Sequence, residues 1–182
     1  MRRRPPARDT PLETSRLALV ASSPQHLLAL IERPERFERL AGLRPAPGLA
    51  ALYTSGEVSP AWIAALRDSS EPDPWRFGFF VVDRESGQVI GSAGFKGPPD
   101  PDGVVEIGYG VVPQHEGRGY ATEAAAALVR FAVASRRVRV VRAHTLPVAN
   151  ASTRVLLKCG FRHIGTVIDP DDGPVWRWER EL

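Results

Sequence analysis

The chain has 182 residues, of which 43% are apolar, so its length and composition fit one globular domain with a buried core. A single cysteine excludes an internal disulfide and a cysteine-rich zinc site, and no apolar run is long enough to cross a membrane. The net charge of +3 suits an anionic ligand, while nucleic acid is not favoured because basic and aromatic residues do not interleave. We expect a cytoplasmic protein with no membrane partner and no metal site.

The basic segment MRRRPPARD opens the chain. No apolar core follows it, so it lacks the pattern of a signal peptide. Much of the positive excess lies in this segment, and chain termini of this kind are usually loosely held. We therefore expect a flexible basic tail over residues 1–13 and a single domain over residues 14–182.

Helical and irregular elements fill the first part of the domain. Alternating leucines predict a strand over residues 16–21. Two Ser-Pro pairs, at residues 23–24 and 59–60, each predict a helix start, and Pro34 predicts a break in the first helix. Residues 44–58 are rich in proline and glycine and predict a loop with one turn of helix. This segment either frames a substrate cleft or only packs against the strands that follow.

From residue 76 onward, the hydrophobic pattern becomes strand-like. We expect strands over residues 76–83, 88–96, 104–112, 138–146, 161–168 and 175–179, a long helix over 121–135 and a short helix over 150–159. Strands that alternate with helices in this way imply a mixed α/β (α+β) sheet in one domain.

The segment VVPQHEGRGYATEAAAALVRFA joins a predicted strand to the longest predicted helix. A helix start has free backbone N–H groups and a partial positive charge, which both suit a phosphate. Gly117 and Gly119 keep side chains away from this place and allow the positive φ of an anion-binding nest. Arg118 and Thr122 add a charge and a hydroxyl. We expect a diphosphate here, although a tight turn without a ligand would also explain the glycines.

Neither a P-loop nor a dinucleotide fingerprint fits this spacing. Instead, Gln114-x-x-Gly117-x-Gly119 fits the Q/R-x-x-G-x-G/A signature of the GNAT superfamily of acyl-CoA-dependent N-acetyltransferases. The runs EIGYGVVPQHEGRGYATEA, HTLPVANASTRVLLKCGF and TSRLALVA resemble the branch that contains the ribosomal-protein N-terminal alanine acetyltransferases. The resemblance extends from Thr14 to Trp178 and is weakest over residues 35–75.

The resemblance implies a mostly antiparallel sheet in which two central strands, over residues 104–112 and 138–146, splay apart around acetyl-CoA. It implies that backbone groups of Gly110, Val111 and Val112 pair with the pantetheine arm, and that Asn150 and Ser152 lie near the sulfur. The residues that would surround the pyrophosphate are Gln114, Gly117, Arg118, Gly119, Tyr120, Ala121 and Thr122.

Two departures from the family pattern affect the second helix. The family asparagine usually stands three residues before the serine, whereas Asn150 stands two before Ser152. Asn150 is therefore a cofactor contact, a helix cap, or both. Many family members also carry a tyrosine on this helix as general acid, where this chain has Leu156 and Leu157. Ser152 is then the hydroxyl expected nearest to the leaving thiolate.

Acyl transfer to an amine needs a base, because an amine of pKa near 10 is almost wholly protonated at neutral pH. Glu106 is the first candidate, since it lies inside an otherwise apolar strand and aligns with the strand glutamate of the histone-modifying branch. An ion pair is the alternative role of Glu106. His144, expected as a satisfied strand residue, and His115, expected to be exposed, are the other candidate bases. The N–H near Val112 is expected to bind the carbonyl oxygen.

We expect an enzyme that transfers acetyl from acetyl-CoA to a primary amine, either a protein N-terminus or a small molecule, by direct attack in a ternary complex. A non-catalytic acyl-CoA sensor and an enzyme for longer acyl-CoA are the alternatives. No covalent nucleophile is needed, so Cys159 is expected to be buried packing, and Tyr109 and Tyr120 are expected to pack against the long helix. The oligomeric state is open, with a homodimer as one option.

Overall fold

The structure is a computed structural model that describes residues 11–55, 59–170 and 172–182. Its strands are β1 Leu12–Glu13, β2 Leu17–Ala21, β3 Arg44–Pro45, β4 Phe79–Asp83, β5 Gln88–Phe95, β6 Val104–Val111, β7 Val140–Thr145, β8 Arg162–Asp169 and β9 Gly173–Glu181. The helices are α1 Pro24–Glu32, α2 Phe37–Ala41, α3 Ala51–Thr54, α4 Pro60–Arg67, α5 Pro74–Phe77, α6 Tyr120–Ser135 and α7 Ala151–Lys158, with 3-10 turns η1 Pro34–Arg36 and η2 Pro113–His115.

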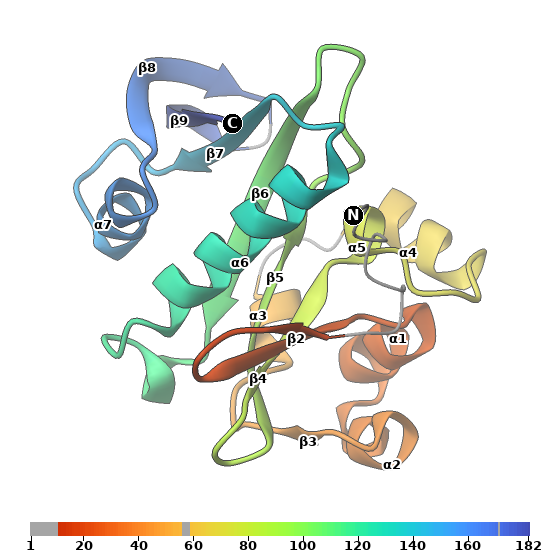
Figure 1. Cartoon of the computed structure of the whole chain (residues 1–182). Helices are drawn as coiled ribbons and strands as arrows, with labels where there is room; N and C mark the ends of the chain where they lie inside the picture. Colours follow the sequence, from red (N-terminus) through yellow and green to blue (C-terminus); the bar gives the residue numbers. More distant parts are fainter. Residues whose placement is uncertain (1–10, 56–58, 171) are drawn as a thin grey trace, which may run out of the picture.

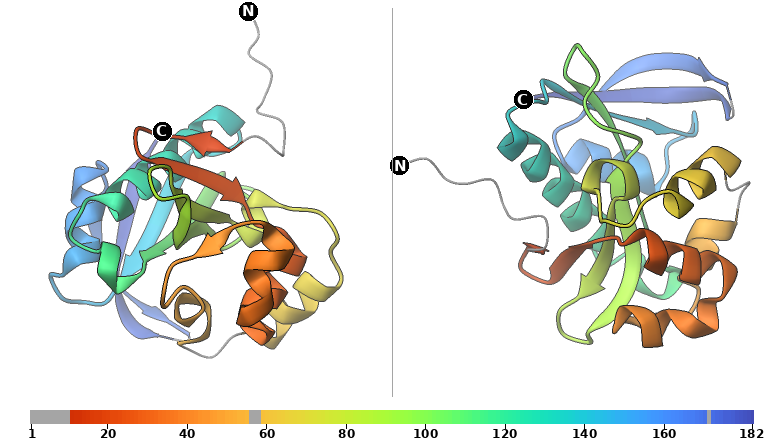
Figure 2. Two further views of the ribbon diagram at one scale, coloured as in Figure 1. Left: turned by 90° about the horizontal axis from the view of Figure 1, so that it is seen from below. Right: turned by 90° about the vertical axis from the view of Figure 1, so that its right-hand side faces the viewer.

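The strands form one sheet in the order β1-β2-β4-β5-β6-β7-β9-β8, with β3 beside β5 (Figure 1). Neighbours are antiparallel except for β6 with β7 and β3 with β5. Figure 2 (right) shows α6 on one side of the sheet and α1 to α4 on the other. The predicted mixed α/β fold with a mostly antiparallel sheet is confirmed.

Aromatic side chains fill the core on both faces of the sheet. Phe80 packs against Phe37 on one face, with ring centroids 5.4 Å apart. Successive residues of a strand point to opposite faces, so the neighbouring Phe79 packs on the other face, 5.5 Å from the ring of Phe131 in α6. These contacts fix α6 against the strands that lead to the predicted ligand loop.

Strands β6 and β7 are the two central strands expected to splay, and they do. They share three residue pairs, the last of which is Glu106 with Arg142. Beyond that pair β6 continues to Val111 and β7 to Thr145 without pairing with each other. The sheet therefore opens on one side of β6, beside the β6–α6 loop.

Several predicted boundaries change in the first part of the chain. The first helix breaks at Pro34 as predicted. The strand predicted to start at residue 76 instead starts at Phe79, because α5 precedes it. Leu12–Glu13 pair with β2 as β1, so the ordered sheet begins before the predicted boundary at residue 14. The rest of the predicted tail, residues 1–10, lies outside the described residues.

Glycine explains how α5 reaches this position. Gly78 has a φ of +66°, and a Cβ on it would lie 2.8 Å from the carbonyl oxygen of Ala93 in β5. A side chain would therefore prevent the close approach of the α5–β4 junction to β5.

Within the described residues, no helix has the length and apolar character needed to cross a membrane.

Candidate active site

The β6–α6 loop presents a bare helix start. Gly117 and Gly119 have φ values of +71° and +81°, in the region that the nest argument requires. Helix α6 has no side-chain cap, so the N–H groups of its first residues are free of helical partners. A Cβ placed on Gly117 would meet no atom within 4 Å. The loop therefore combines open space with converging donors, which fits a diphosphate.

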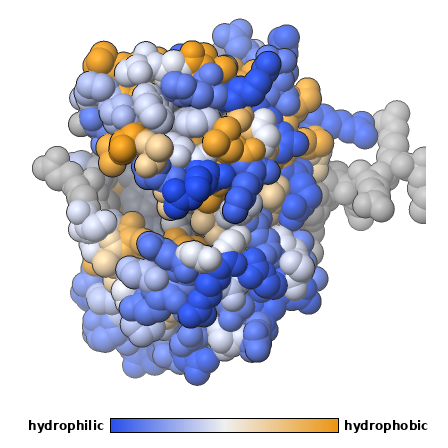
Figure 3. Space-filling view, turned by 90° about the vertical axis from the view of Figure 1, so that its left-hand side faces the viewer, coloured by the Kyte–Doolittle hydropathy of each residue, from blue (hydrophilic) through white to orange (hydrophobic). Residues whose placement is uncertain are grey.

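The predicted loop residues differ in what they can offer to a ligand. Gln114, Gly117, Arg118 and Gly119 are exposed, and Ala121 and Thr122 are half-buried. The side chain of Tyr120 is buried, so only its backbone N–H can contribute. The face shown in Figure 3 is hollowed between an upper and a lower part, and both hydrophilic and hydrophobic residues border the hollow.

Tyr120 anchors the helix start to the sheet, as its predicted packing role requires. Its hydroxyl lies 3.5 Å from Asp83 at the end of β4. The guanidinium of Arg16 lies over its ring, 4.5 Å from the centroid. His115 lies beside the same ring, with centroids 5.9 Å apart. His115 is half-buried rather than exposed, so that prediction is wrong, because the loop folds back over Tyr120.

Glu123, in the first turn of α6, ties the loop to the N-terminal strand. One carboxylate oxygen accepts hydrogen bonds from the hydroxyls of Thr14 and Ser15 and, at 2.8 Å, from the N–H of Arg16. The other oxygen accepts from Arg16 Nε at 2.8 Å. Arg16 Nη1 in turn donates to the carbonyl of Arg118 at 2.9 Å. We call Arg16 and Glu123 the loop clamp. No local sequence pattern predicts the loop clamp, because 107 residues separate its two members.

The carboxylate of this clamp is strongly acidic. Burial acts to raise the pKa of Glu123, but hydrogen bonds from Thr14, Arg16 and Ser15 outweigh burial and lower this pKa to about 2. Glu123 is therefore ionised throughout the neutral range. A negative charge in the first turn also interacts favourably with the positive end of the helix.

The backbone of β6 divides its hydrogen bonds between two sides. The N–H of Lys96 donates to the carbonyl of Glu106, and the N–H of Val112 donates to Ile90, at 2.9 and 2.8 Å. In an antiparallel pair, alternate residues point their polar backbone groups toward the partner strand. Even-numbered residues of β6 thus bond to β5, and odd-numbered residues such as Val111 point into the gap beside β7.

This alternation decides which backbone groups near Val112 are available to a ligand. The N–H of Val112 already donates to Ile90, so the nearest N–H that points into the gap is that of Val111. Gly110, like Val112, is even-numbered, so its backbone groups point to Ser92 in β5. Tyr109 and Val111 carry the outward groups that an amide-containing arm could pair with. The register of two strands fixes this choice, and one strand alone does not reveal it.

Glu106 lies on the face of β6 opposite α6 and is paired. Its Oε1 is 2.6 Å from Lys96 Nζ and 3.1 Å from His144 Nδ1. Oε2 has no partner among the described residues. Burial acts to lower the pKa of Lys96, but the hydrogen bond and charge of Glu106, with the charges of Asp169 and Asp172, raise it. Both predicted roles of Glu106 fit, because one oxygen forms the ion pair and the other is available for a proton.

His144 connects Glu106 to a third group. Arg177 Nε donates to His144 Nε2 at 3.4 Å, and Nδ1 lies on the side of Glu106. The approach of Nδ1 to the carboxylate is not aligned for a hydrogen bond, and Nδ1 has no other partner in the described chain. His144 is a strand residue whose side chain is 14% exposed, close enough to Glu106 to orient it.

The start of α7 meets β6 across the gap. Tyr109 donates its hydroxyl to the carbonyl of Ser152 at 3.4 Å. Burial raises the pKa of Tyr109 to about 12, against the hydrogen bond with Ser152, so this hydroxyl stays protonated. The sequence placed Tyr109 under the long helix as packing. Tyr109 does pack against the core, and its hydroxyl also brings a phenol to α7, which itself has no tyrosine.

Asn150 caps α7, as one of its two predicted roles. Its side chain accepts from the N–H of Thr153 at 3.0 Å, and the hydroxyl of Thr153 accepts from the N–H of Asn150 at 3.1 Å. The amide N–H groups of Asn150 form no hydrogen bond with the described part of the chain, so a contact with a ligand is compatible with the cap.

Cys159 is buried packing, as predicted. Its side chain is 5% exposed, and its thiol donates to the carbonyl of Thr122. Burial raises the pKa of Cys159, against the charge of Arg180. A neutral, buried thiol at the end of α7 is not a nucleophile.

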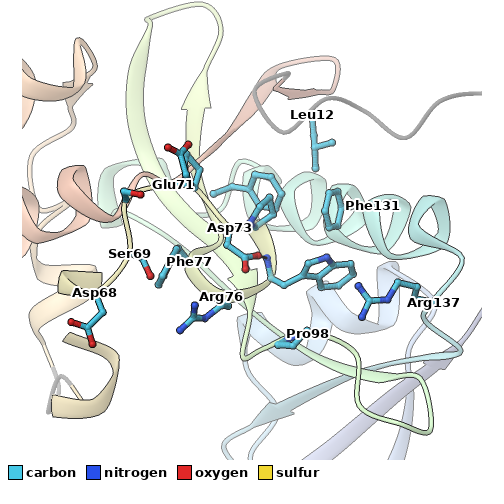
Figure 4. Close-up of a pocket in the computed structure, with 15 residues that line it drawn as sticks. Leu12, Asp68, Ser69, Glu71, Asp73, Arg76, Phe77, Pro98, Phe131 and Arg137 are labelled. Atoms are coloured by element: carbon cyan, nitrogen blue, oxygen red, sulfur yellow. Dashed lines mark hydrogen bonds between the residues drawn. The ribbon is translucent and has the colours of Figure 1, made fainter. Parts of the chain in front are cut away.

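Two cavities lie outside the loop. One of about 540 Å³ borders Gly108 and Lys96 on the face of β6 that carries Glu106. The other, of about 600 Å³, lies between α5 and the C-terminal end of α6 and is drawn in Figure 4, where Phe131 and Arg137 are among the labelled residues that line it. Only the first cavity adjoins the strand that leads into the ligand loop.

Comparison with known proteins agrees with this geometry. The model of the acetyltransferase (GNAT) domain matches residues 16–162. An uncharacterized N-acetyltransferase, YjdG of Bacillus subtilis, is 32% identical over 89 residues, which are 49% of this chain and 51% of that protein. The chain spans about half the length of the curated relatives it matches.

Solved structures share the fold along nearly the whole chain. Ribosomal-protein-S5-alanine acetyltransferase from Vibrio fischeri has a TM-score of 0.65 at 14% identity, covering 95% of this chain and 97% of that one. RimJ of Mycobacterium smegmatis, solved with CoA-disulfide, has a TM-score of 0.61 at 19% identity, covering 91% and 82%. The branch that the sequence resembles is thus among the fold neighbours. With a family model that matches most of its length, the chain belongs to the GNAT acetyltransferase family.

Proposed function

We propose that the protein transfers the acetyl group of acetyl-CoA to a primary amine by direct attack in a ternary complex. The observation that carries the proposal is that three features meet on β6. Its outer edge is open beyond Glu106, its end leads into the uncapped start of α6, and its face carries Glu106 beside a cavity. One strand thus brings together a place for an amide-bearing arm, a place for a diphosphate and a base.

Acetyl-CoA, when bound, supplies the acetyl group as an activated thioester. The exposed loop residues Gln114, Gly117, Arg118 and Gly119, with the N–H groups of Tyr120, Ala121 and Thr122, would hold the pyrophosphate. The outward backbone groups of Tyr109 and Val111 would pair with the pantetheine arm, and Asn150 would contribute its free amide donors. These residues fit the group because Gly117 leaves open space and the helix start is uncapped.

The acceptor amine would lie over Gly108. Glu106, Gly108 and Gly110 alternate onto the same face of β6, and Gly108 is exposed with no atom within 4 Å of the place of its Cβ. Two residues along a strand span roughly 7 Å, so a group over Gly108 lies within reach of the Glu106 side chain. Glu106 Oε2 would take the proton of the amine, directly or through a water.

The remaining groups would manage the charge that develops in the reaction. As the amine nitrogen bonds to the carbonyl carbon, the N–H of Val111 would bind the oxygen, because it points into the gap. As the carbon–sulfur bond breaks, the hydroxyl of Tyr109 would hydrogen-bond the thiolate, assisted by Ser152. A phenol of pKa about 12 serves better as a hydrogen-bond donor than as a full proton donor to a thiolate.

The test has two measurements on the wild-type chain. Calorimetric titration with acetyl-CoA should give saturable binding, and release of the CoA thiol should follow when a mixture of primary amines is added. Binding without thiol release for any amine would leave a non-catalytic acyl-CoA sensor. Absence of binding by the folded chain would refute both functions. Titration with longer acyl-CoA thioesters would show whether the donor is acetyl-CoA itself.

A further inference from the structure

The cavity beside Gly108 has walls of distinctive chemistry. It measures about 540 Å³ and is lined by aromatic side chains that include Tyr53 and Trp62 from α3 and α4. The indole of Trp62 is held in place by a hydrogen bond of 3.4 Å from Nε1 to the carbonyl of Arg76. Burial raises the pKa of Tyr53 above its usual range, against a hydrogen bond with Ser92, so its ring stays neutral. A cavity with aromatic walls suits a ligand that has a flat, apolar body.

The charges of the cavity are positive. Arg76 and Lys96 line it, and no described lining residue is acidic. Lys96 is already paired with Glu106. Arg76 is exposed and makes no ion pair with a described residue, and its guanidinium lies over the ring of Phe77 at 5.3 Å. Arg76 is therefore the cation with capacity for an anionic group of a ligand.

The second cavity provides an internal contrast. Asp68, Glu71 and Asp73 line it, together with Arg76 and Arg137 (Figure 4). A polycationic molecule would therefore find three carboxylates there, whereas the carboxylate next to the cavity beside Gly108, that of Glu106, is paired with Lys96. An acceptor in the cavity beside Gly108 would thus meet Arg76, a cation without an ion-pair partner in the described chain.

From these features, we propose that the acceptor is a primary amine with a flat apolar body and an anionic group, carboxylate or phosphate, which Arg76 binds. The amine would lie over Gly108, the body between Tyr53 and Trp62, and the anion at Arg76. This inference rests on the proposed acetyl transfer, and it names the class of acceptor for the same site.

Three benzylamines that differ only in the para substituent test the inference. They carry a carboxylate, a methyl group or an aminomethyl group at the para position, opposite the reacting amine. For each, kcat/KM is measured by release of the CoA thiol, and Kd is measured by calorimetry on the protein saturated with CoA. We expect the carboxylate compound to exceed the methyl compound by roughly tenfold or more in both quantities, and the aminomethyl compound to be the poorest.

Substitutions assign the preference to the proposed residues. Arg76→Gln should remove the advantage of the carboxylate compound over the methyl compound, in both kcat/KM and Kd. Trp62→Ala should weaken all three amines to a similar extent. Arg130→Gln, which removes an exposed positive charge on α6 away from the cavity, should change nothing and controls for net charge.

The outcomes separate the two levels of the inference. The acceptor class would be overturned if the enzyme preferred the aminomethyl compound, or if the Arg76→Gln variant still preferred the carboxylate compound. Either result would still support acetyl transfer. The expected order of Kd without turnover of any amine would support the site and refute the enzymatic function. Equal Kd for all three amines would overturn the role of Arg76.

Discussion

The two sides of β6 that we propose to bind ligands are built in different ways. The proposed cofactor side comes from one continuous segment, in which β6 runs through η2 into α6. The proposed acceptor side is assembled from α3, α4, α5 and β5, which reach β6 from distant parts of the chain. A continuous segment carries its own recognition pattern, whereas an assembled wall depends on tertiary packing. This difference decides what could be predicted from the sequence and where each substitution should act.

The first substitution tests the proposed cofactor side and should have the largest effect. The double change Gly117→Asp with Gly119→Asp adds two carboxylates where the pyrophosphate would lie. We expect Kd for acetyl-CoA to rise by roughly a hundredfold or more, measured by calorimetry. Gly42→Asp is the matched control, because Gly42 also has a positive φ, of +66°, with open space around it. Unchanged affinity in the double variant would mean that the glycines only form a turn.

The second substitution acts on the face between the two sides. Glu106→Gln keeps the shape of the side chain and removes its basicity. We expect kcat to fall roughly a hundredfold while Kd for acetyl-CoA stays the same. Glu181→Gln, an exposed carboxylate that pairs with Arg162 in β8, controls for loss of one charge. A kcat within threefold of wild type would exclude Glu106 as the base and direct attention to His144.

The third substitution compares two tyrosines on opposite sides. Tyr109→Phe removes the hydroxyl that faces Ser152 and should lower kcat by about tenfold without changing the KM of the amine. Tyr53→Phe removes a hydroxyl from the wall of the acceptor cavity and should change the KM of the amine more than kcat. Steady-state kinetics for both variants checks this split. The same kinetic change in both would remove the distinction between the sides.

The fourth substitution tests the loop clamp through pH. At neutral pH, Glu123→Gln should lower the free energy of unfolding by about 1–3 kcal/mol, because it weakens hydrogen bonds to a charged group. The pKa of Glu123 is lowered from 4.5 to about 2, so its contribution is fully present above pH 4.5 and is lost as the pH falls toward 2. Urea unfolding from pH 7 to pH 3 should show the two proteins converging.

The clamp should also affect ligand binding. The Arg16 guanidinium holds the carbonyl of Arg118 within the loop, so Glu123→Gln should raise Kd for acetyl-CoA several-fold. Glu32→Gln, which breaks an exposed pair with Arg67, is the control for stability and affinity. A stability difference at pH 3 that is as large as the difference at pH 7 would contradict the role of the ionised carboxylate.

The smallest effect is expected at Cys159, whose thiol lies behind the proposed cofactor side and donates to the carbonyl of Thr122. Cys159→Ala should leave kcat and both KM values unchanged, because the thiol is buried and neutral. It should lower the free energy of unfolding by about 1 kcal/mol through the lost packing volume. Loss of activity in a stable, folded variant would contradict the direct attack in a ternary complex. Mass spectrometry for an acetylated Cys159 in the wild type provides an independent check.

The sequence predicted well what depends on neighbouring residues. The broken helix at Pro34, the glycine-rich start of α6 and the cap at Asn150 follow from local backbone preferences. The splay of two strands came from the family resemblance, and the end of pairing at Glu106 with Arg142 agrees with it.

The remaining features required contacts between distant residues. The partner of the Val112 N–H depends on the register of β5 with β6, and one strand does not fix it. The strand pattern predicts only packing for Tyr109. It does not predict the contact with Ser152, because Ser152 belongs to a different element. Arg16 and Glu123 are both ordinary surface residues in the sequence, and only the docking of β2 beside α6 brings them together.

The three residue pairs between β6 and β7 have a consequence for the lifetime of the protein. This short ladder is where the two halves of the sheet join, so a pantetheine arm in the gap would add contacts that hold the two halves together. A ligand that binds the folded chain alone adds about 2.7 kcal/mol of stability at one hundred times its Kd. We therefore expect resistance to heat and proteolysis to follow the acetyl-CoA concentration, so that starvation for the donor would also shorten the survival of the protein.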